Sequence, residues 1–253
     1  MVIPAYDEAR RLPRYLRDVV AYFDGHGEPY EVLVVDDGSR DDTAERVQEL
    51  AAEHPAVALV SRPVNQGKGA AVRTGMLQAR GALRLMADAD GATPILEIKR
   101  LEAAVQWGAD LAVGSRALVD PSVVVRARPH RRLSGRVFIA ITRALGVRQV
   151  VDTQCGFKLF RGGVADDLFG ALGTEGFAFD VELILRAERR GYRIAEVPVP
   201  WRYGTETKVN PLRDTLRCLR DVLTVRWYAL RGMYQGLNAP LPATPAEETA
   251  HKR

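Results

Sequence analysis

Short apolar runs alternate with helical stretches through the first two thirds of the chain. The runs that predict buried strands are Val2–Ile3, Glu31–Val35, Ala56–Ser61, Ala82–Ala87 and Ala109–Val113. Between them, apolar residues recur at helical spacing over Arg10–Phe23 and Gly69–Arg80, and Asp41–Thr43 is typical of a helix start. We therefore expect an α/β fold with a mostly parallel sheet and helices on both faces.

Polar motifs follow the predicted strands repeatedly. They are Asp36–Asp37, Arg62–Lys68, Asp88–Asp90 and Ser115–Arg116. In open α/β sheets, ligands bind at the carboxyl ends of the strands, where these motifs fall. The spacing therefore predicts one site built from several loops at that edge.

The triplet Asp88-Ala89-Asp90 is the strongest candidate for chemistry. Two carboxylates directly after a buried strand suit Mg²⁺ or Mn²⁺, which takes one or two carboxylates and leaves positions for phosphate oxygens. Such an ion would act as a Lewis acid on a departing diphosphate. The same triplet also occurs in solvated turns, so this motif alone does not decide between the two readings.

Two further loops carry groups suited to a nucleotide. Asp36–Ser39 offers carboxylates for a base or ribose, although the same pattern forms helix-capping turns. Asn65–Gly69 leads into a helix, so its amides and Lys68 are placed to meet phosphate. It lacks the spacing of a P-loop, which argues against a nucleoside triphosphatase.

Charge and composition point to an anionic partner, which could be nucleic acid, a phosphorylated substrate or a lipid headgroup. The net charge is +4, and residues 121–151 contain seven arginines and no acidic side chain. Segments 134–145 and 212–234 predict amphipathic helices that suit a membrane interface, although the same pattern also suits helices packed on the core with solvated arginines. No apolar run is long enough to span a bilayer. With two cysteines, Cys155 and Cys218, a reducing compartment is expected, and Cys155 is interpreted as a packed residue.

The order of the motifs resembles the family 2 glycosyltransferases over roughly residues 1–210. Within that family the chain is similar to the polyprenyl-phosphate sugar synthases, above all the dolichyl-phosphate β-glucosyltransferases, and next to the mannose synthases. The motifs that carry the resemblance are Pro4–Glu8, Val34–Ser39, Asn65–Gly69, Asp88–Thr93 and Asp152–Phe160. The resemblance implies a GT-A, Rossmann-like fold with added amphipathic interfacial helices.

The resemblance also implies a role for each matching position. The donor nucleotide sugar would be held by Pro4, Tyr6, Glu8, Asp37, Lys68, Asp88 and Arg202, with Lys208 as an alternative to Arg202. Asp90 and Asp88 would bind the metal, and Asp90 is the surer ligand. The mannose enzymes carry a Gln two positions after the second Asp, where this chain has Ala92, so glucose is favoured over mannose.

The acceptor phosphate would contact Arg116, Arg131, Ser134 and Lys158, with Arg132 as an alternative to Arg131. A phosphate monoester is already largely dianionic at pH 7, so this acceptor needs no general base to deprotonate it. Asp152 and Asp180 therefore stay open as bases, as orienting residues, or as partners of nearby cations. Asp152 and Arg116 are counted with Asp88 and Asp90 as the candidate catalytic set.

The sequence thus predicts transfer of glucose from UDP-glucose to a polyprenyl phosphate with inversion, by a peripheral enzyme on the cytoplasmic side of a membrane. The expected organisation is a catalytic domain over 1–205, with the Arg-rich acceptor segment at 121–150. An amphipathic helix over 206–237 and a disordered tail over 238–253 would follow. A homo-oligomer or a separate membrane anchor is an open expectation, and nucleic acid is not an expected partner.

Three rivals remain at this point. GDP-mannose as donor keeps the mechanism and changes the sugar. A processive polysaccharide synthase would need a firm base and membrane spans. A non-catalytic module that binds acidic lipid or nucleic acid is permitted by the basic segment, although no groove-reading motif stands out.

Overall fold

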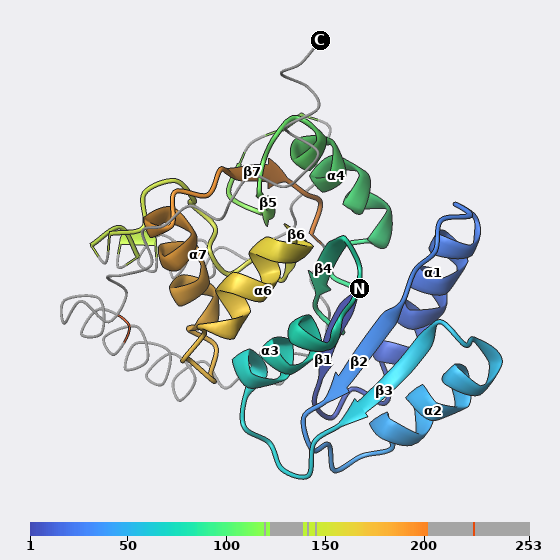
Figure 1. Cartoon of the computed structure of the whole chain (residues 1–253). Helices are drawn as coiled ribbons and strands as arrows, with labels where there is room; N and C mark the ends of the chain where they lie inside the picture. Colours follow the sequence, from blue (N-terminus) through green and yellow to red (C-terminus); the bar gives the residue numbers. More distant parts are fainter. Residues whose placement is uncertain (119, 122–138, 141, 145, 202–224, 226–253) are drawn as a thin grey trace.

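The computed structural model describes residues 1–118, 120–121, 139–140, 142–144, 146–201 and 225. One seven-stranded sheet runs through them in the order β3-β2-β1-β4-β6-β5-β7 (Figure 1). The strands are β1 (Val2–Ala5), β2 (Val32–Asp36), β3 (Val57–Ser61), β4 (Leu83–Ala87), β5 (Leu111–Ser115), β6 (Phe157–Arg161) and β7 (Ile194–Pro198). β6 is antiparallel to both of its neighbours, and the other pairs are parallel.

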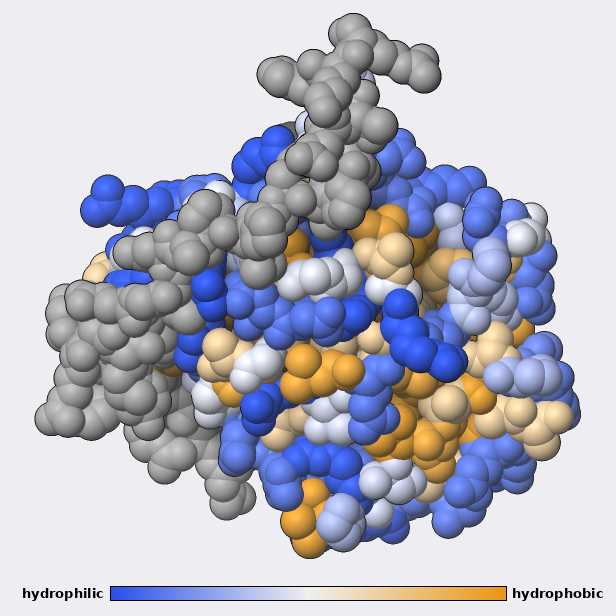
Figure 2. Space-filling model, viewed as in Figure 1, coloured by the Kyte–Doolittle hydropathy of each residue, from blue (hydrophilic) through white to orange (hydrophobic). Residues whose placement is uncertain are grey.

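Helices cover both faces of the sheet. They are α1 (Leu12–Asp24), α2 (Thr43–Glu53), α3 (Lys68–Gln78), the short 3-10 helix η1 (Ile95–Glu97), α4 (Ile98–Gln106), α6 (Gly162–Gly170) and α7 (Phe179–Arg189). Residues 139–140 and 142–144 are also helical. Figure 2 shows that the described part of one face is a mosaic of hydrophilic and hydrophobic areas.

Two apolar cores lie on opposite sides of the sheet because side chains alternate along each strand. Val35 and Met86 pack with α3, α6 and α7 on one side. Val34 and Leu85 pack with α1, α2 and α4 on the other. All five residues of β2 are buried, as expected for a strand covered on both faces.

The antiparallel direction of β6 decides where the polar motifs meet. β4 and β5 end at the carboxyl edge of the sheet, whereas β6 begins there, with Phe157 opposite Ala87. The loop before β6 therefore lies beside the segment after β4, and the amide of Asp88 donates to the carbonyl of Gly156 at 3.0 Å. Two motifs more than sixty positions apart in the sequence become neighbours in this way.

The fold-class prediction is confirmed, and the predicted strands and helices of residues 1–115 occur within a few positions of their expected bounds. The predicted interfacial helix over 206–237 and the tail over 238–253 lie outside the described residues, apart from Val225. Val225 is helical and fully buried in the core that contains α3 and α7. Within the described residues, no helix combines the length and apolar character needed to cross a bilayer.

Candidate active site

The carboxylate of Asp88 rests on the backbone of Gly156. A Cβ added at Gly156 would lie 2.0 Å from Oδ2 of Asp88 and 2.1 Å from its Cγ. Only glycine leaves room for the carboxylate at this place, which gives a physical reason for the glycine in the Asp152–Phe160 motif. A second glycine, Gly91, lies in the turn that carries Asp88 and Asp90. Its φ of +60° allows the chain to fold back after Asp90.

Lys68, the first residue of α3, lies against this turn. Its Nζ is 2.6 Å from Oδ1 of Asp88, and it also sits over the ring of Phe179 at 5.9 Å from the centroid. Burial disfavours the charged amine, but Asp88, Asp180 and Asp90 outweigh burial and raise the pKa of Lys68. Lys68 and the Asp88–Asp90 turn therefore lie together at the carboxyl edge of the sheet, and the contact of Lys68 with donor phosphate stays a prediction.

Asp90 is the outer carboxylate of the pair. Its Oδ1 accepts a hydrogen bond from the amide of Ala92 at 3.0 Å. Partial burial, followed by the negative charge of Asp88, raises the pKa of Asp90 above its ordinary value. Two carboxylates that repel each other in this way form a site that a cation would stabilise.

Asp88 and Asp90 fit a divalent cation that takes its remaining ligands from a substrate. No group of three or more His, Cys, Asp or Glu side chains that could hold a metal ion occurs among the described residues, so the protein would supply at most this pair of carboxylates. Oδ1 of Asp88 is buried, and its charged partner within the described chain is Nζ of Lys68 at 2.6 Å. Mg²⁺ commonly uses one or two carboxylates together with phosphate oxygens and water.

Lys158 does not face the surface, contrary to its predicted contact with the acceptor phosphate. Its side chain is fully buried on β6, where Nζ donates to the carbonyl of Cys155 at 2.6 Å and forms an ion pair with Asp180. Burial raises the pKa of Asp180 although Lys158 and Lys68 oppose that shift. We correct the prediction accordingly: Lys158 neutralises Asp180 in the interior, because a buried lysine needs a charge partner.

Arg116 and Asp152 form another ion pair at this edge of the sheet. Nε and Nη2 of Arg116 lie 2.7 Å from Oδ2 and Oδ1 of Asp152, and the amide of Arg116 donates to Oδ2 at 2.9 Å. Burial alone would raise the pKa of Asp152, but these bonds from Arg116 hold it below its ordinary value. The guanidinium also lies over the ring of Trp201, 5.7 Å from its centroid.

Asp37 organises the Asn65–Gly69 loop. Its carboxylate accepts hydrogen bonds from the amides of Gln66 (3.2 Å) and Gly67 (2.8 Å) and pairs with Arg62 at 2.8 Å. Just after this loop, in the first turn of α3, the amide of Ala70 donates to the carbonyl of Glu175. Several groups that were predicted to meet the nucleotide are therefore engaged within the protein, and a donor contact by Asp37 stays a prediction.

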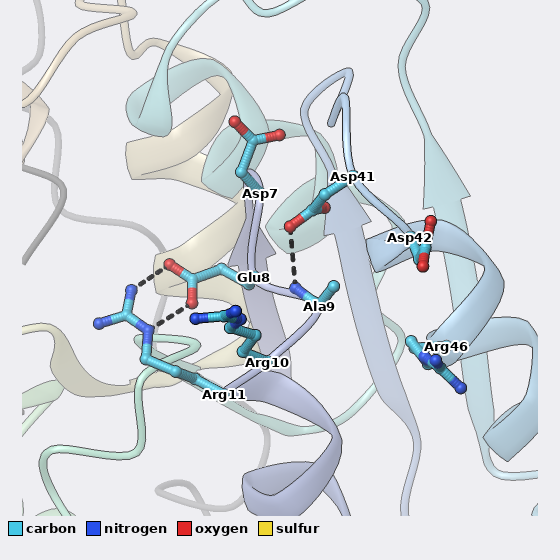
Figure 3. Close-up of a pocket in the computed structure, with 8 residues that line it drawn as sticks. All are labelled: Asp7, Glu8, Ala9, Arg10, Arg11, Asp41, Asp42 and Arg46. Carbon is cyan, nitrogen blue, oxygen red and sulfur yellow. Dashed lines mark hydrogen bonds and ion pairs between the residues drawn. The ribbon is translucent and has the colours of Figure 1, made fainter. Parts of the chain in front are cut away.

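The loop after β1 borders a separate hollow of about 450 Å³. Figure 3 shows that residues 7–11 form one side of this hollow and the start of α2 forms the other. The carboxylate of Glu8 is turned toward Arg11, whose Nε lies 2.7 Å from Oε2. Of the predicted donor residues that the structure describes, only Glu8 lines this hollow; Pro4 is buried within β1, and Tyr6 is half-buried just after it.

The structure thus brings together Asp88, Asp90, Lys68, Arg116 and Asp152 at one edge of the sheet. Arg131, Ser134 and Arg202 lie outside the described residues, so their predicted contacts stay predictions. The interpretation of Cys155 as a packed residue is supported: the side chain is 1% exposed, and burial together with Asp152 raises its pKa to about 12.

Sequence reasoning missed three parts of this site. The first is the contact between the carboxylate of Asp88 and the backbone of Gly156, which could not be predicted because the apolar pattern of β6 does not indicate its direction. The interior role of Lys158 was also missed, although its place inside the apolar strand Phe157–Arg161 is a signal that could have revealed it. The third is Tyr15 on α1, which packs against the Asp88–Gly91 turn.

Residues 1–169 match the family model described as glycosyl transferase family 2. The chain therefore belongs to glycosyl transferase family 2, and its mostly parallel sheet with flanking helices has the GT-A fold.

Within the family the chain is similar to proteins named dolichyl-phosphate beta-glucosyltransferase. One from Trichomonas vaginalis is 37% identical over 243 residues, which cover 92% of this chain and 72% of the relative. The Drosophila melanogaster protein is 38% identical, with 89% and 73% covered. The human protein is 34% identical, with 93% and 76% covered.

Solved structures agree on the fold. Glucosyl-3-phosphoglycerate synthase from Mycobacterium tuberculosis, in complex with Mn²⁺, UDP-glucose and phosphoglyceric acid, superposes with a TM-score of 0.67 at 20% identity, covering 89% of this chain and 78% of the other. Mannosyl-3-phosphoglycerate synthase from Rubrobacter xylanophilus has the same TM-score and identity, with 98% and 78% covered.

Proposed function

We propose that this protein transfers glucose from UDP-glucose to a polyprenyl phosphate of the dolichyl type, with inversion at the anomeric carbon and with the help of Mg²⁺ or Mn²⁺. The names of the relatives support the sugar and the lipid. The solved neighbours crystallised with Mn²⁺ or Mg²⁺ and a uridine nucleotide support the metal and the donor class.

The observation that carries the proposal is the state of the two candidate bases. Asp152 forms a bidentate ion pair with the guanidinium of Arg116, and Asp180 is paired with Lys158 in the interior. A hydroxyl acceptor would need a carboxylate that is available to take its proton. A phosphate acceptor brings its own charge, since its second pKa is about 6. The arrangement therefore suits a phosphate nucleophile better than a sugar hydroxyl.

The reaction is then a single displacement. An oxygen of the acceptor phosphate attacks C1 of glucose, while the bond from C1 to the diphosphate oxygen breaks and its electron pair leaves with UDP. No proton needs to be removed from the nucleophile. The new bond forms on the opposite face of C1, which inverts the anomeric configuration.

The side chains gathered at the carboxyl edge of the sheet would each have a role in this step. Asp88 and Asp90 would hold the cation, which supplies Lewis-acid stabilisation of the diphosphate when it is bound. Lys68 lies 2.6 Å from Asp88 and is placed to turn from that carboxylate to the leaving diphosphate. Arg116, fixed in direction by Asp152, presents a guanidinium that suits an acceptor phosphate.

The location follows from the acceptor. A long isoprenoid stays in the bilayer, so the enzyme has to work at the membrane surface. The Arg-rich segment 121–150 and the predicted helix 206–237 are the proposed contact region, because each cation near anionic lipid adds about 1 kcal/mol of attraction. We place this surface on the cytoplasmic side, with an anchor partner or a second copy as open additions.

The deciding experiment is a turnover assay on the purified full chain with a short polyprenyl phosphate and either UDP-glucose or GDP-mannose. We expect a lipid-linked product from UDP-glucose, lost on addition of EDTA and restored by Mn²⁺. A product from GDP-mannose alone would overturn the sugar assignment. Release of free UDP without a lipid product would overturn the acceptor.

A further inference from the structure

Tyr15 lies beneath the aspartate turn. It is on α1, its side chain is 5% exposed, and its ring is the surface on which Gly91 folds. A Cβ added at Gly91 would lie 2.8 Å from Cδ2 of the tyrosine ring. The ring therefore supports the Asp88–Gly91 segment from the side of α1.

The hydroxyl of Tyr15 is buried and has no hydrogen-bond partner within the described part of the chain. Burying a hydroxyl without a partner is costly, so such a group in a folded protein calls for an explanation, such as a ligand or a bound water. Burial, and then the charges of Asp88 and Asp90, raise the pKa of this tyrosine. The hydroxyl thus stays protonated and lies in the field of both carboxylates.

A second buried polar atom, Oδ1 of Asp88, belongs to the turn that the Tyr15 ring supports. Its charged partner in the empty protein is Nζ of Lys68, 2.6 Å away. If Lys68 turns to the diphosphate of the donor, as the proposed function requires, Asp88 loses that cation and needs another group to fix its direction. A phenol can donate and a carboxylate can only accept, so the two are complementary.

We propose that Tyr15 is a positioning residue. Its hydroxyl orients the carboxylates of Asp88 and Asp90 when the donor is bound, and it makes no such contact in the empty protein. This inference rests on the proposed donor and metal site. It predicts an unusual combination in Tyr15→Phe: binding of the metal and nucleotide becomes weaker, while the empty protein becomes no less stable. Groups that orient metal ligands from behind typically contribute roughly 10- to 100-fold in affinity.

The test compares Tyr15→Phe with Tyr22→Phe, a tyrosine on the same helix that is not placed in the site. Binding of UDP is titrated by calorimetry in the presence and absence of Mn²⁺, and thermal unfolding is measured without ligand. We expect Tyr15→Phe to bind UDP with Mn²⁺ roughly 10- to 100-fold more weakly. We also expect its melting temperature to be equal to or above that of the wild type, and Tyr22→Phe to bind as the wild type does.

Wild-type affinity in Tyr15→Phe would overturn the inference. So would a clear fall in its melting temperature, because the hydroxyl would then be serving the fold of the empty protein. If the wild type itself shows no Mn²⁺-dependent binding of UDP, the donor site of the proposed function fails, and this inference fails with it. Comparing the wild type and the variant therefore separates the two failures.

Discussion

Arg116 and Asp152 join the end of β5 to the loop that leads into β6. Two side-chain contacts of 2.7 Å and one backbone contact of 2.9 Å fix the guanidinium in a single direction. The Asp152 side chain is 8% exposed and that of Arg116 is 31% exposed, so the pair is shielded on the carboxylate side only. A paired, directed arginine at this edge is suited to receiving an anion that arrives from solvent.

Asp152→Ala is expected to cost stability as well as activity. Breaking a fully buried pair costs roughly 3–5 kcal/mol, and the partial exposure of Arg116 lowers our expectation to about 2–3 kcal/mol. Urea unfolding of the variant and the wild type measures this loss of unfolding free energy. In turnover assays the KM for the lipid phosphate should rise more than the KM for the donor, since Arg116 loses its direction. An unchanged acceptor KM would contradict the assignment of Arg116.

The same pair makes a pH-dependent contribution. The pKa of Asp152 is lowered in the folded protein, so the stability from this pair is fully present above the unfolded value of about 3.9. It is lost as the pH falls through the lower folded pKa. We therefore expect the stability difference between wild type and Asp152→Asn to be constant from pH 8 to 5 and to shrink below about pH 4. A difference that changes between pH 6 and 8 would point to another group.

Gly156→Ala should displace the carboxylate of Asp88, because the new Cβ would lie 2.0 Å from Oδ2. We expect loss of Mn²⁺-dependent UDP binding and a lower melting temperature, measured on the same protein. Gly163→Ala is the matched control, since its Cβ meets nothing within 4 Å and it lies in α6. That control should be up to about 1 kcal/mol more stable, from helix propensity. Normal UDP binding by Gly156→Ala would show that Asp88 is not a ligand in this position.

The sequence was sufficient to predict the parallel part of the sheet and the edge where the motifs gather. Buried parallel strands read as continuous apolar runs, as in Val32–Val35, and short polar loops mark their ends. Lys68 and Asp88 could be expected near each other for the same reason. The order of the strands in the sheet could not be predicted, because an apolar run does not indicate which other strand it pairs with.

Side-chain partners were harder to predict than positions. Lys158 matches a family motif, and its charge suggested a phosphate, but its side chain points into the core, where Asp180 is the partner. Asp37 is expected to meet a nucleotide, and its carboxylate also accepts hydrogen bonds from the amides of a loop about thirty residues away, which its local sequence did not indicate. Whether a charged group faces a ligand or another residue depends on tertiary contacts that the local pattern does not encode.

The interior pair of Lys158 and Asp180 can be tested by a double-mutant cycle. Lys158→Met leaves Asp180 buried without its nearest cation and should cost roughly 3–5 kcal/mol in urea unfolding. Adding Asp180→Asn removes the stranded charge and should recover a large part of that loss, with a coupling energy of about 1–3 kcal/mol. If Lys158 instead contacted the acceptor, the single variant would stay stable and show only a raised KM for the lipid phosphate.

Asp90→Asn is expected to lower turnover without lowering the stability of the empty protein. The pKa of Asp90 is raised by partial burial and by Asp88, so at neutral pH its ionised form works slightly against folding. The variant should therefore melt at the same temperature as the wild type or slightly higher when no ligand is present. Turnover should fall about 100-fold or more, which corresponds to roughly 3 kcal/mol of lost transition-state stabilisation by the cation. Near-normal turnover, with an unchanged response to EDTA, would exclude Asp90 as a metal ligand.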